Sequence, residues 1–258
     1  MTLRGVIERF EQKTGRAFTL TCIPLLFGLI GCRDTQGPEE LPPARTLQFN
    51  TGDRFIYEGR VTNQYGVSLD SLRSRHIWDV LSTNSQRHGF SDVVVICDST
   101  VFLVMDSTVV DTLFFRATTN GEVLRYGFLA ELLARRQQLQ VPKAWDRIAW
   151  FGTDVWTVGT LDSGRQFPLT AQFGQQKDYF DVKLNGASIV FPADRVEMSG
   201  QTLDYFLWLS DAPSCFPLWE EAPDLFNNIL RGSLLILREA TIAPHPGYFL
   251  RSSQSRTW

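Results

Sequence analysis

The sequence predicts a mainly β (α+β) fold: an antiparallel sheet, curved or half-barrel-like, with one or two short helices. Short segments in which apolar and polar side chains alternate recur along the chain, which is the period of a half-buried strand. Turn-forming dipeptides separate these segments, and Asn120-Gly121 is a strong signal for a hairpin. Helical spacing of apolar residues is clear only twice, so helices are minor elements of the domain.

The first expected strand shows the alternation plainly, because Phe55, Tyr57 and Val61 are separated by polar residues. A turn at Tyr65-Gly66 follows, and Asn185-Gly186 and Ser199-Gly200 are expected at later hairpin tips. The expected strands lie within 53–63, 72–83, 93–117, 122–128, 144–152, 154–161, 168–174, 178–186, 187–191, 194–200, 201–210 and 233–242.

A short motif occurs twice, as Asp98-Ser99-Thr100-Val101 and as Asp106-Ser107-Thr108-Val109. Asp and Ser favour turns because their side chains bond to nearby backbone groups, so we expect a tight antiparallel meander here. A calcium-binding ladder of carboxylates is the alternative, although the spacing matches no known calcium loop.

Two segments have helical spacing. In residues 128–140, leucines recur at helical intervals after Phe128, and Pro142 ends the pattern. In residues 223–232, Pro223 stands early and Gly232 closes the segment, which predicts a second short helix.

Composition and charge exclude several functional classes. Apolar residues make up 43% and charged residues 21% of the chain, an ordinary globular composition, and the net charge of −3 with no basic tract argues against nucleic-acid binding. The three histidines, His76, His88 and His245, have no metal-ligand spacing, and we expect His76, beside Trp78, to be a packed core residue. We therefore expect no metal and no cofactor. The lack of a GxSxG motif and of a phosphate-binding glycine loop favours a protein that is not an enzyme but leaves that question open.

The N-terminal segment has the pattern of an export signal. Arg4, Arg9, Lys13 and Arg16 precede an apolar run from Ala17 to Cys32, which is too short to span a bilayer comfortably. The run ends in Leu29-Ile30-Gly31-Cys32, which resembles the lipobox of bacterial lipoproteins. The resemblance implies recognition by a signal peptidase through Leu29, Ile30 and Gly31, with lipidation (diacylglycerol and commonly a further acyl chain such as palmitate) at Cys32. An uncleaved anchor, or a cut elsewhere, is the alternative.

This resemblance divides the chain into a signal peptide (1–31), a lipidated cysteine with a flexible tether (32–45), a single β-rich domain (46–250) and a polar tail (251–258). Gly37, Pro38, Pro42 and Pro43 give the tether its partly stiffened character. Arg33 follows the cysteine where Asp would favour inner-membrane retention in the family. We therefore expect a lipid-anchored envelope protein, at the outer membrane facing the periplasm rather than at the inner membrane.

Two further sets of residues are candidates for sites. Cys97 and Cys215 remain after the signal and the lipidated cysteine are set aside, and in an oxidising compartment they either form a disulfide or remain separate buried thiols. The tryptophans Trp145, Trp150, Trp156 and Trp208 either pack in the core or line an apolar cleft for a lipid, a glycan or a partner segment.

In its length, its predicted membrane location and its order of strands followed by a helix, the chain resembles the lipoprotein carriers and receptors of the outer-membrane localisation pathway. Those proteins hold acyl chains in an apolar cavity. Three functions follow as hypotheses. The first is a non-enzymatic binding or scaffolding lipoprotein that contacts an envelope protein. The second is a carrier or receptor for a hydrophobic ligand, and the third is a hydrolase of envelope polymers.

Overall fold

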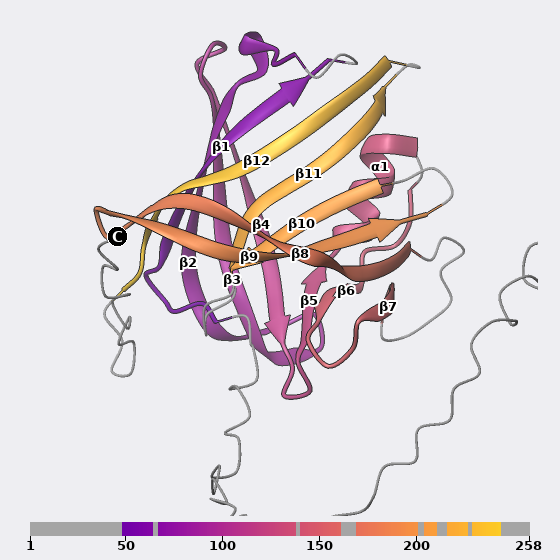
Figure 1. Cartoon of the computed structure of the whole chain (residues 1–258). Helices are drawn as coiled ribbons and strands as arrows, with labels where there is room; N and C mark the ends of the chain where they lie inside the picture. Colours follow the sequence, from indigo (N-terminus) through magenta and orange to yellow (C-terminus); the bar gives the residue numbers. More distant parts are fainter. Residues whose placement is uncertain are drawn as a thin grey trace, which may run out of the picture. The chain divides into compact units, whose positions relative to one another are not determined.

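The computed structural model describes residues 48–63, 67–137, 140–160, 169–200, 204–210, 216–226 and 229–243. A 12-stranded, strongly curved sheet dominates this part of the chain (Figure 1). The strands are β1 (Arg54–Thr62), β2 (Ser74–Arg87), β3 (Phe90–Phe102), β4 (Ser107–Ala117), β5 (Glu122–Tyr126), β6 (Trp145–Trp150), β7 (Val155–Val158), β8 (Leu169–Leu184), β9 (Ala187–Ser199), β10 (Asp204–Ser210), β11 (Pro217–Phe226) and β12 (Ile229–Thr241). The described helices are the 3-10 turn η1 (Asp70–Leu72) and α1 (Phe128–Gln137).

The strand order is that of two meanders joined by the first and last strands. The sheet runs β6-β5-β4-β3-β2-β1-β12-β11-β10-β9-β8-β7, and its neighbours in this order are antiparallel wherever pairing is described. The long hairpin of β8 and β9 also reaches β12, where Ala240 pairs in parallel with Leu184. The fold class predicted from the sequence is therefore confirmed, and the sheet is not a closed barrel.

The concave face changes character along its strands. On β2, Trp78 and Val80 point into the hydrophobic core, whereas Ser74 and His76, on the same face, line a cavity. On β3, Ile96 belongs to the core and Asp98 to the cavity. Since residues two apart share a face of a strand, one end of the concave face is packed with apolar side chains and the other is polar.

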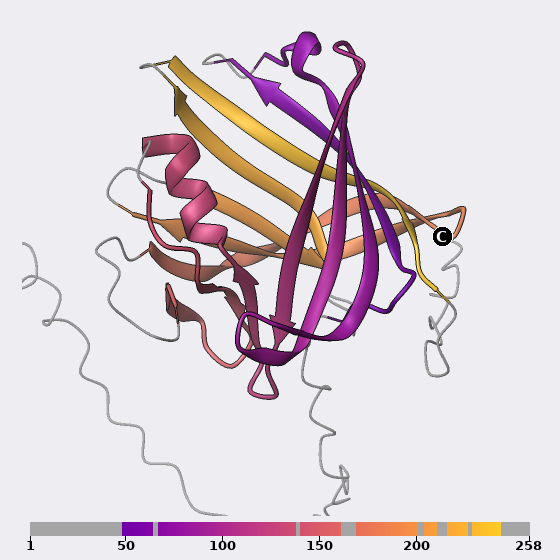
Figure 2. The same ribbon diagram turned by 180° about the vertical axis from the view of Figure 1, so that it is seen from behind.

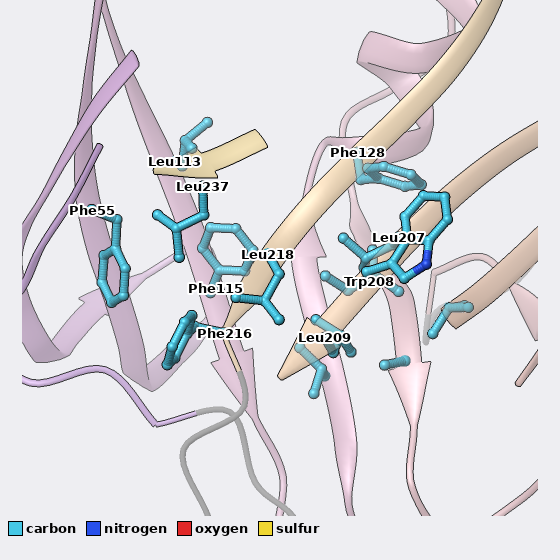
Figure 3. Close-up of a cluster of buried hydrophobic side chains, with 14 of the residues drawn as sticks. Phe55, Leu113, Phe115, Phe128, Leu207, Trp208, Leu209, Phe216, Leu218 and Leu237 are labelled. Atoms are coloured by element: carbon cyan, nitrogen blue, oxygen red, sulfur yellow. The ribbon is translucent and has the colours of Figure 1, made fainter. Parts of the chain in front are cut away.

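The packed end is built largely from aromatic and branched side chains, several of which are drawn in Figure 3. The Phe55 ring lies 5.4 Å from that of Phe216, and the Tyr57 ring lies 4.6 Å from that of Trp78. Phe115 on β4 is 1% exposed and its ring lies 6.0 Å from that of Trp78. Such ring pairs stabilise the packing beyond the area that they bury.

Helix α1 packs its apolar side against the same sheet (Figures 1 and 2). Phe128 contacts the Tyr205 ring of β10 with centroids 4.9 Å apart. At the start of the helix, the Leu129 N–H donates to Asp146 Oδ2 at 2.7 Å, and Asp146 is fully buried on β6. A carboxylate here satisfies an amide that has no partner within the helix and lies at the positive end of its dipole.

The prediction of a helix over 223–232 is wrong, because the described residues of this segment, 223–226 and 229–232, form parts of β11 and β12. The two strands pair with each other from Phe226↔Ile229 onward, and β12 also pairs with β1. This long-range pairing overrides a local helical pattern. Pro223 lies beyond the last described β10 pair, Phe206↔Glu221, so its described strand partner is β12 alone, and proline is tolerated where a strand lacks a neighbour on one side.

The turn predictions have mixed outcomes. Asn185 and Gly186 connect β8 and β9 with φ of 48° and 84°, as a hairpin turn with two left-handed residues requires. Asn120-Gly121 likewise lies between β4 and β5. The Asp98–Val101 motif, however, lies inside β3, and its repeat begins at Asp106 in the β3–β4 turn. Pairing of β3 with both β2 and β4 accounts for this difference.

Candidate functional site

A cavity of about 440 Å³ occupies the polar end of the concave face. Its volume lies in the range of pockets that bind small molecules. Its lining combines aliphatic and aromatic side chains with ionisable ones, from strands at both ends of the sequence and from α1. The lining residues are Gly59, Arg60, Val61, Leu72, Ser74, His76, Asp98, Thr100, Phe102, Val109, Asp111, Arg125, Phe128, Glu131, Leu132, Tyr205, Glu220, Leu234 and Leu235.

Arg125 on β5 is the main buried cation of this cavity, with a side chain 13% exposed. Its Nη2 donates to Glu131 Oε2 at 3.0 Å, and its Nη1 lies 3.9 Å from Glu220 Oε1. Burial alone would lower the pKa of Arg125, but the nearby carboxylates Glu220 and Glu131 outweigh burial and raise it. Arg125 is therefore a fixed positive charge in the cavity wall.

The Nε–H of Arg125 has no acceptor among the described residues. Leaving a buried donor without an acceptor costs about 1–3 kcal/mol. The guanidinium carbon also lies 5.6 Å from the centroid of the Phe128 ring, so the cation adjoins an apolar wall. An arrangement of this kind suits a ligand that brings a hydrogen-bond acceptor together with an apolar part.

His76 forms the centre of a second polar group in the cavity. Its Nε2 lies 3.2 Å from Ser74 Oγ, and its Nδ1 lies 3.3 Å from Asp98 Oδ2 and 2.9 Å from Thr100 Oγ1. Strand register creates this group: Ser74 and His76 are two residues apart on β2, and His76 pairs directly with Thr100 on β3. We call Ser74, His76, Thr100 and Asp98 the histidine relay.

Gly59 on β1 makes room for the histidine relay. It pairs with Ser74, and a Cβ built at position 59 would lie 2.2 Å from Ser74 Oγ and 3.1 Å from His76 Nε2. Real Cβ atoms do not approach other heavy atoms so closely. A glycine is therefore needed at this position of β1, against which the Ser74 and His76 side chains pack.

Tyr57, two residues before Gly59, closes the inner end of the polar region. Its ring is fully buried, and its hydroxyl donates to the Pro217 carbonyl at 3.0 Å. Burial raises the pKa of Tyr57 well above its usual value, and the charges of Glu220 and Asp98 raise it further. The phenol thus remains a neutral donor that ties β1 to β11.

Another cavity, of about 500 Å³, adjoins β1, β2 and the tip of the β8–β9 hairpin. Glu58 lies in its lining and forms ion pairs with Arg60 at 2.7 Å, with Arg73 at 3.1 Å and with Arg238 at 2.9 Å. The hydrogen bond from Arg60 is the largest cause that lowers the pKa of Glu58 to about 2; burial opposes it, and the hydrogen bond from Arg238 lowers the pKa further. The lining of this cavity holds three acidic and three basic side chains, whose charges balance, so the concave cavity is the stronger candidate for a binding site.

Several residues predicted as sites lie outside the described residues, namely Leu29, Ile30, Gly31, Cys32 and Cys215. Cys97 is half-buried on β3, with its Sγ 3.9 Å from Ser99 Oγ. The lipidation site and the Cys97–Cys215 disulfide therefore stay predictions.

The four tryptophans do not gather in one place. Trp156 and Trp208 belong to the main core, Trp150 packs against it, and Trp145 lies in a separate cluster. None of them lines the two cavities described above. In the separate cluster, the Trp145 indole donates to the His88 carbonyl at 3.1 Å, and the His88 ring stacks on Tyr126 at 3.7 Å.

Sequence reasoning missed the histidine relay, although a signal for it exists. Ser74, His76, Trp78 and Val80 are alternate residues of one predicted strand, and the face that they share turns from polar to apolar. Assigning His76 to packing beside Trp78 overlooked this change. The pairing with Asp98 depends on the β2–β3 register, which several bulges alter.

Comparison with protein-family models and with curated proteins finds no match. Among solved structures, the chain is similar to a candidate lipoprotein from Parabacteroides distasonis, with 12% identity, a TM-score of 0.40, and coverage of 76% of this chain and 99% of that one. It is also similar to a candidate exported protein with a YmcC-like fold from Bacteroides fragilis, with 8% identity, a TM-score of 0.39 and the same coverage. At these identities no residue role passes from either protein to this chain.

No helix in the described part of the chain is long and apolar enough to cross a membrane.

Proposed function

We propose that this protein is a cell-envelope lipoprotein, anchored through Cys32, whose β-rich domain binds a small amphiphilic ligand in the concave cavity. The observation that carries the binding role is the cavity of about 440 Å³ with a buried guanidinium against an apolar wall. We propose the outer membrane, with the domain facing the periplasm, as its location.

The proposed address depends on the N-terminal sequence. A basic segment, an apolar run of signal-peptide length and Leu29-Ile30-Gly31-Cys32 occur in the order that export and lipidation need. Stable membrane residence takes two or more acyl chains, which the resembled lipoproteins carry on the modified cysteine. The tether would then hold the sheet domain near the bilayer.

The proposed ligand is amphiphilic because the cavity is. Val61, Phe102 and Leu234 offer apolar contact area, while Arg125 supplies a donor and Asp111 an acceptor. Ligand pockets generally combine a mostly apolar lining with a few polar groups that fix orientation. The Arg125 guanidinium carries a positive charge beside this apolar lining, so a polar or negatively charged group on the ligand is expected near it.

The address is tested with a Cys32→Ser variant of the full-length chain. We expect the wild-type protein to sediment with membranes and to carry an acylated N-terminal cysteine in mass spectra, and the variant to lose both properties. Cys22→Ser is the matched control, because Cys22 precedes the proposed cut and should leave acylation unchanged. A mature protein that begins elsewhere than at Cys32 would refute lipid anchoring through this residue.

The binding role is tested by filling the cavity. Val61 lies in the cavity lining, whereas Val190 on β9 is 57% exposed and lies outside it. We expect the full-length Val61→Trp variant to lose a small molecule that co-purifies with wild type, and Val190→Trp to retain it. Equal amounts of the same molecule released from both variants on denaturation would place binding elsewhere.

A further inference from the structure

The hydrogen bonds of the histidine relay favour a proton on Nδ1 of His76. The Thr100 hydroxyl donates to Asp98 Oδ1 at 3.4 Å, so its oxygen is left to accept from His76 Nδ1 at 2.9 Å. The Nδ1–H also faces Asp98 Oδ2. Since a neutral imidazole has one donor and one acceptor, Nε2 carries the lone pair and accepts from the Ser74 hydroxyl.

This is the connectivity of a nucleophilic serine. A hydroxyl hydrogen-bonds to an imidazole base, and the other nitrogen of the base donates to a buried carboxylate that holds its tautomer. Asp98 is 13% exposed and His76 22% exposed, so the relay is largely sheltered from water. We infer that Ser74, His76 and Asp98 form a hydrolytic site for small carboxylic esters bound in the concave cavity.

Access to Ser74 supports a reactive role over a purely structural one. Although Ser74 as a whole is 6% exposed, it is the one described residue that lines both cavities. The Ser74 Oγ lies where a side chain at position 59 would be, so a glycine is needed there to hold the hydroxyl beside His76 Nε2.

The surrounding lining indicates carboxylic esters as the substrate class. An acyl chain can lie against Val61, Phe102 and Leu234. Arg125 places a positive charge in the lining of the same cavity, and positive charge near the carbonyl oxygen stabilises the negative charge that develops there. In the described part of the chain, no group of three or more His, Cys, Asp or Glu residues could hold a metal ion.

The chemistry balances without a further reactant except water. Ser74 Oγ forms a bond to the ester carbonyl carbon while its proton passes to His76 Nε2. The carbon–oxygen bond to the alcohol then breaks, and the alcohol leaves with that proton. Water attacks the acyl-serine with His76 again as the base, which releases the carboxylic acid and restores Ser74.

This inference rests on the proposed binding in the concave cavity, and one experiment on the full-length detergent-purified chain separates the two. The protein is treated with a fluorophosphonate probe, which phosphonylates activated serines, and the modified peptide is identified by mass spectrometry. Labelling of wild type at Ser74 is expected, with about a 100-fold loss or more in Ser74→Ala and in His76→Asn. Ser99→Ala is the control, because Ser99 lies on β3 outside the cavity lining.

Ligand retention by the same samples tells the two proposals apart. If wild type retains its co-purifying molecule but Ser74 is not labelled, the hydrolytic site is refuted and the binding role stands. If Ser74 is labelled but no molecule co-purifies, stable retention of a ligand is refuted and the hydrolytic site stands. Labelling that persists in His76→Asn would show a serine that reacts without the relay and would overturn the inference, provided that circular dichroism shows the variant to be folded.

Discussion

Replacing Gly59 by Ala should destabilise the protein through a single identifiable clash. The new Cβ would lie 2.2 Å from Ser74 Oγ and 3.1 Å from two atoms of the His76 ring. The backbone at Gly59 has no left-handed φ, so strain from the main chain does not contribute. In an open strand position, the same substitution would stabilise by about 0.5–1 kcal/mol, because glycine loses more backbone freedom on folding.

The expected loss of unfolding free energy depends on the side chains of Ser74 and His76, which must move to admit the new Cβ. Ser74 is 6% exposed and cannot swing its hydroxyl away without losing the hydrogen bond to His76, a loss of about 0.5–1.5 kcal/mol. Shifting the His76 ring adds the cost of overpacking, which is typically about 1–3 kcal/mol. After the backbone gain of alanine is set against these, we expect Gly59→Ala to lower the free energy of unfolding by about 1–3 kcal/mol.

A double-mutant cycle identifies the clash. Ser74→Ala removes the oxygen that the new Cβ meets, so Gly59→Ala should cost at least 1 kcal/mol less in the Ser74→Ala background than in wild type. The free energies come from urea unfolding of all four proteins, with the denaturant dependence compared between them. A Gly59→Ala variant as stable as wild type, or one that Ser74→Ala does not rescue, would refute the placement of the relay against β1.

Three further predictions concern other parts of the sheet. Arg60 and Arg238 lower the pKa of Glu58 from 4.5 to about 2, which corresponds to ~3.4 kcal/mol, but their partial exposure should reduce the benefit to about 1–2 kcal/mol. Because the folded pKa is depressed, this stability is present above about pH 4.5 and is lost as pH falls towards 2; urea titrations of wild type and Glu58→Gln should therefore differ at pH 6 and converge near pH 2. Asp146→Ala leaves the Leu129 amide without its acceptor and should cost about 1–3 kcal/mol in urea unfolding, whereas an unchanged midpoint would contradict the capping role. Phe115→Ala should cost about 3–5 kcal/mol, because the site is enclosed by other rings and cannot collapse easily; a loss below 1 kcal/mol would contradict the packing described.

The sheet could be predicted from the sequence because its signals are local. Alternation in β1 and the left-handed turn at Asn185-Gly186 depend on neighbouring residues alone. The segment over 223–232 could not be predicted correctly, since its helical spacing is local whereas the pairing of β12 with β1, which includes Gly232↔Thr62, is not. Tertiary pairing decides the structure of such ambiguous segments.

The candidate site was less accessible from the sequence than the fold. Arg125, Glu220 and His76 are widely separated in the chain and meet only because the first and last strands, β1 and β12, pair. The tryptophans looked like the stronger signal, but Trp145 lies in a separate cluster from Trp156 and Trp208. Polar residues on an otherwise apolar strand face, as at Ser74 and His76, carried more information than aromatic content did.

Native mass spectrometry of the full-length protein, purified in detergent from cell envelopes, tests the central claim most directly. A lipoprotein that binds a ligand in the concave cavity should show the mass of the acylated chain plus one bound small molecule, and this molecule should dissociate on denaturation. The Val61→Trp variant should show the acylated chain alone. A folded wild-type protein whose mass contains no bound molecule would contradict the account.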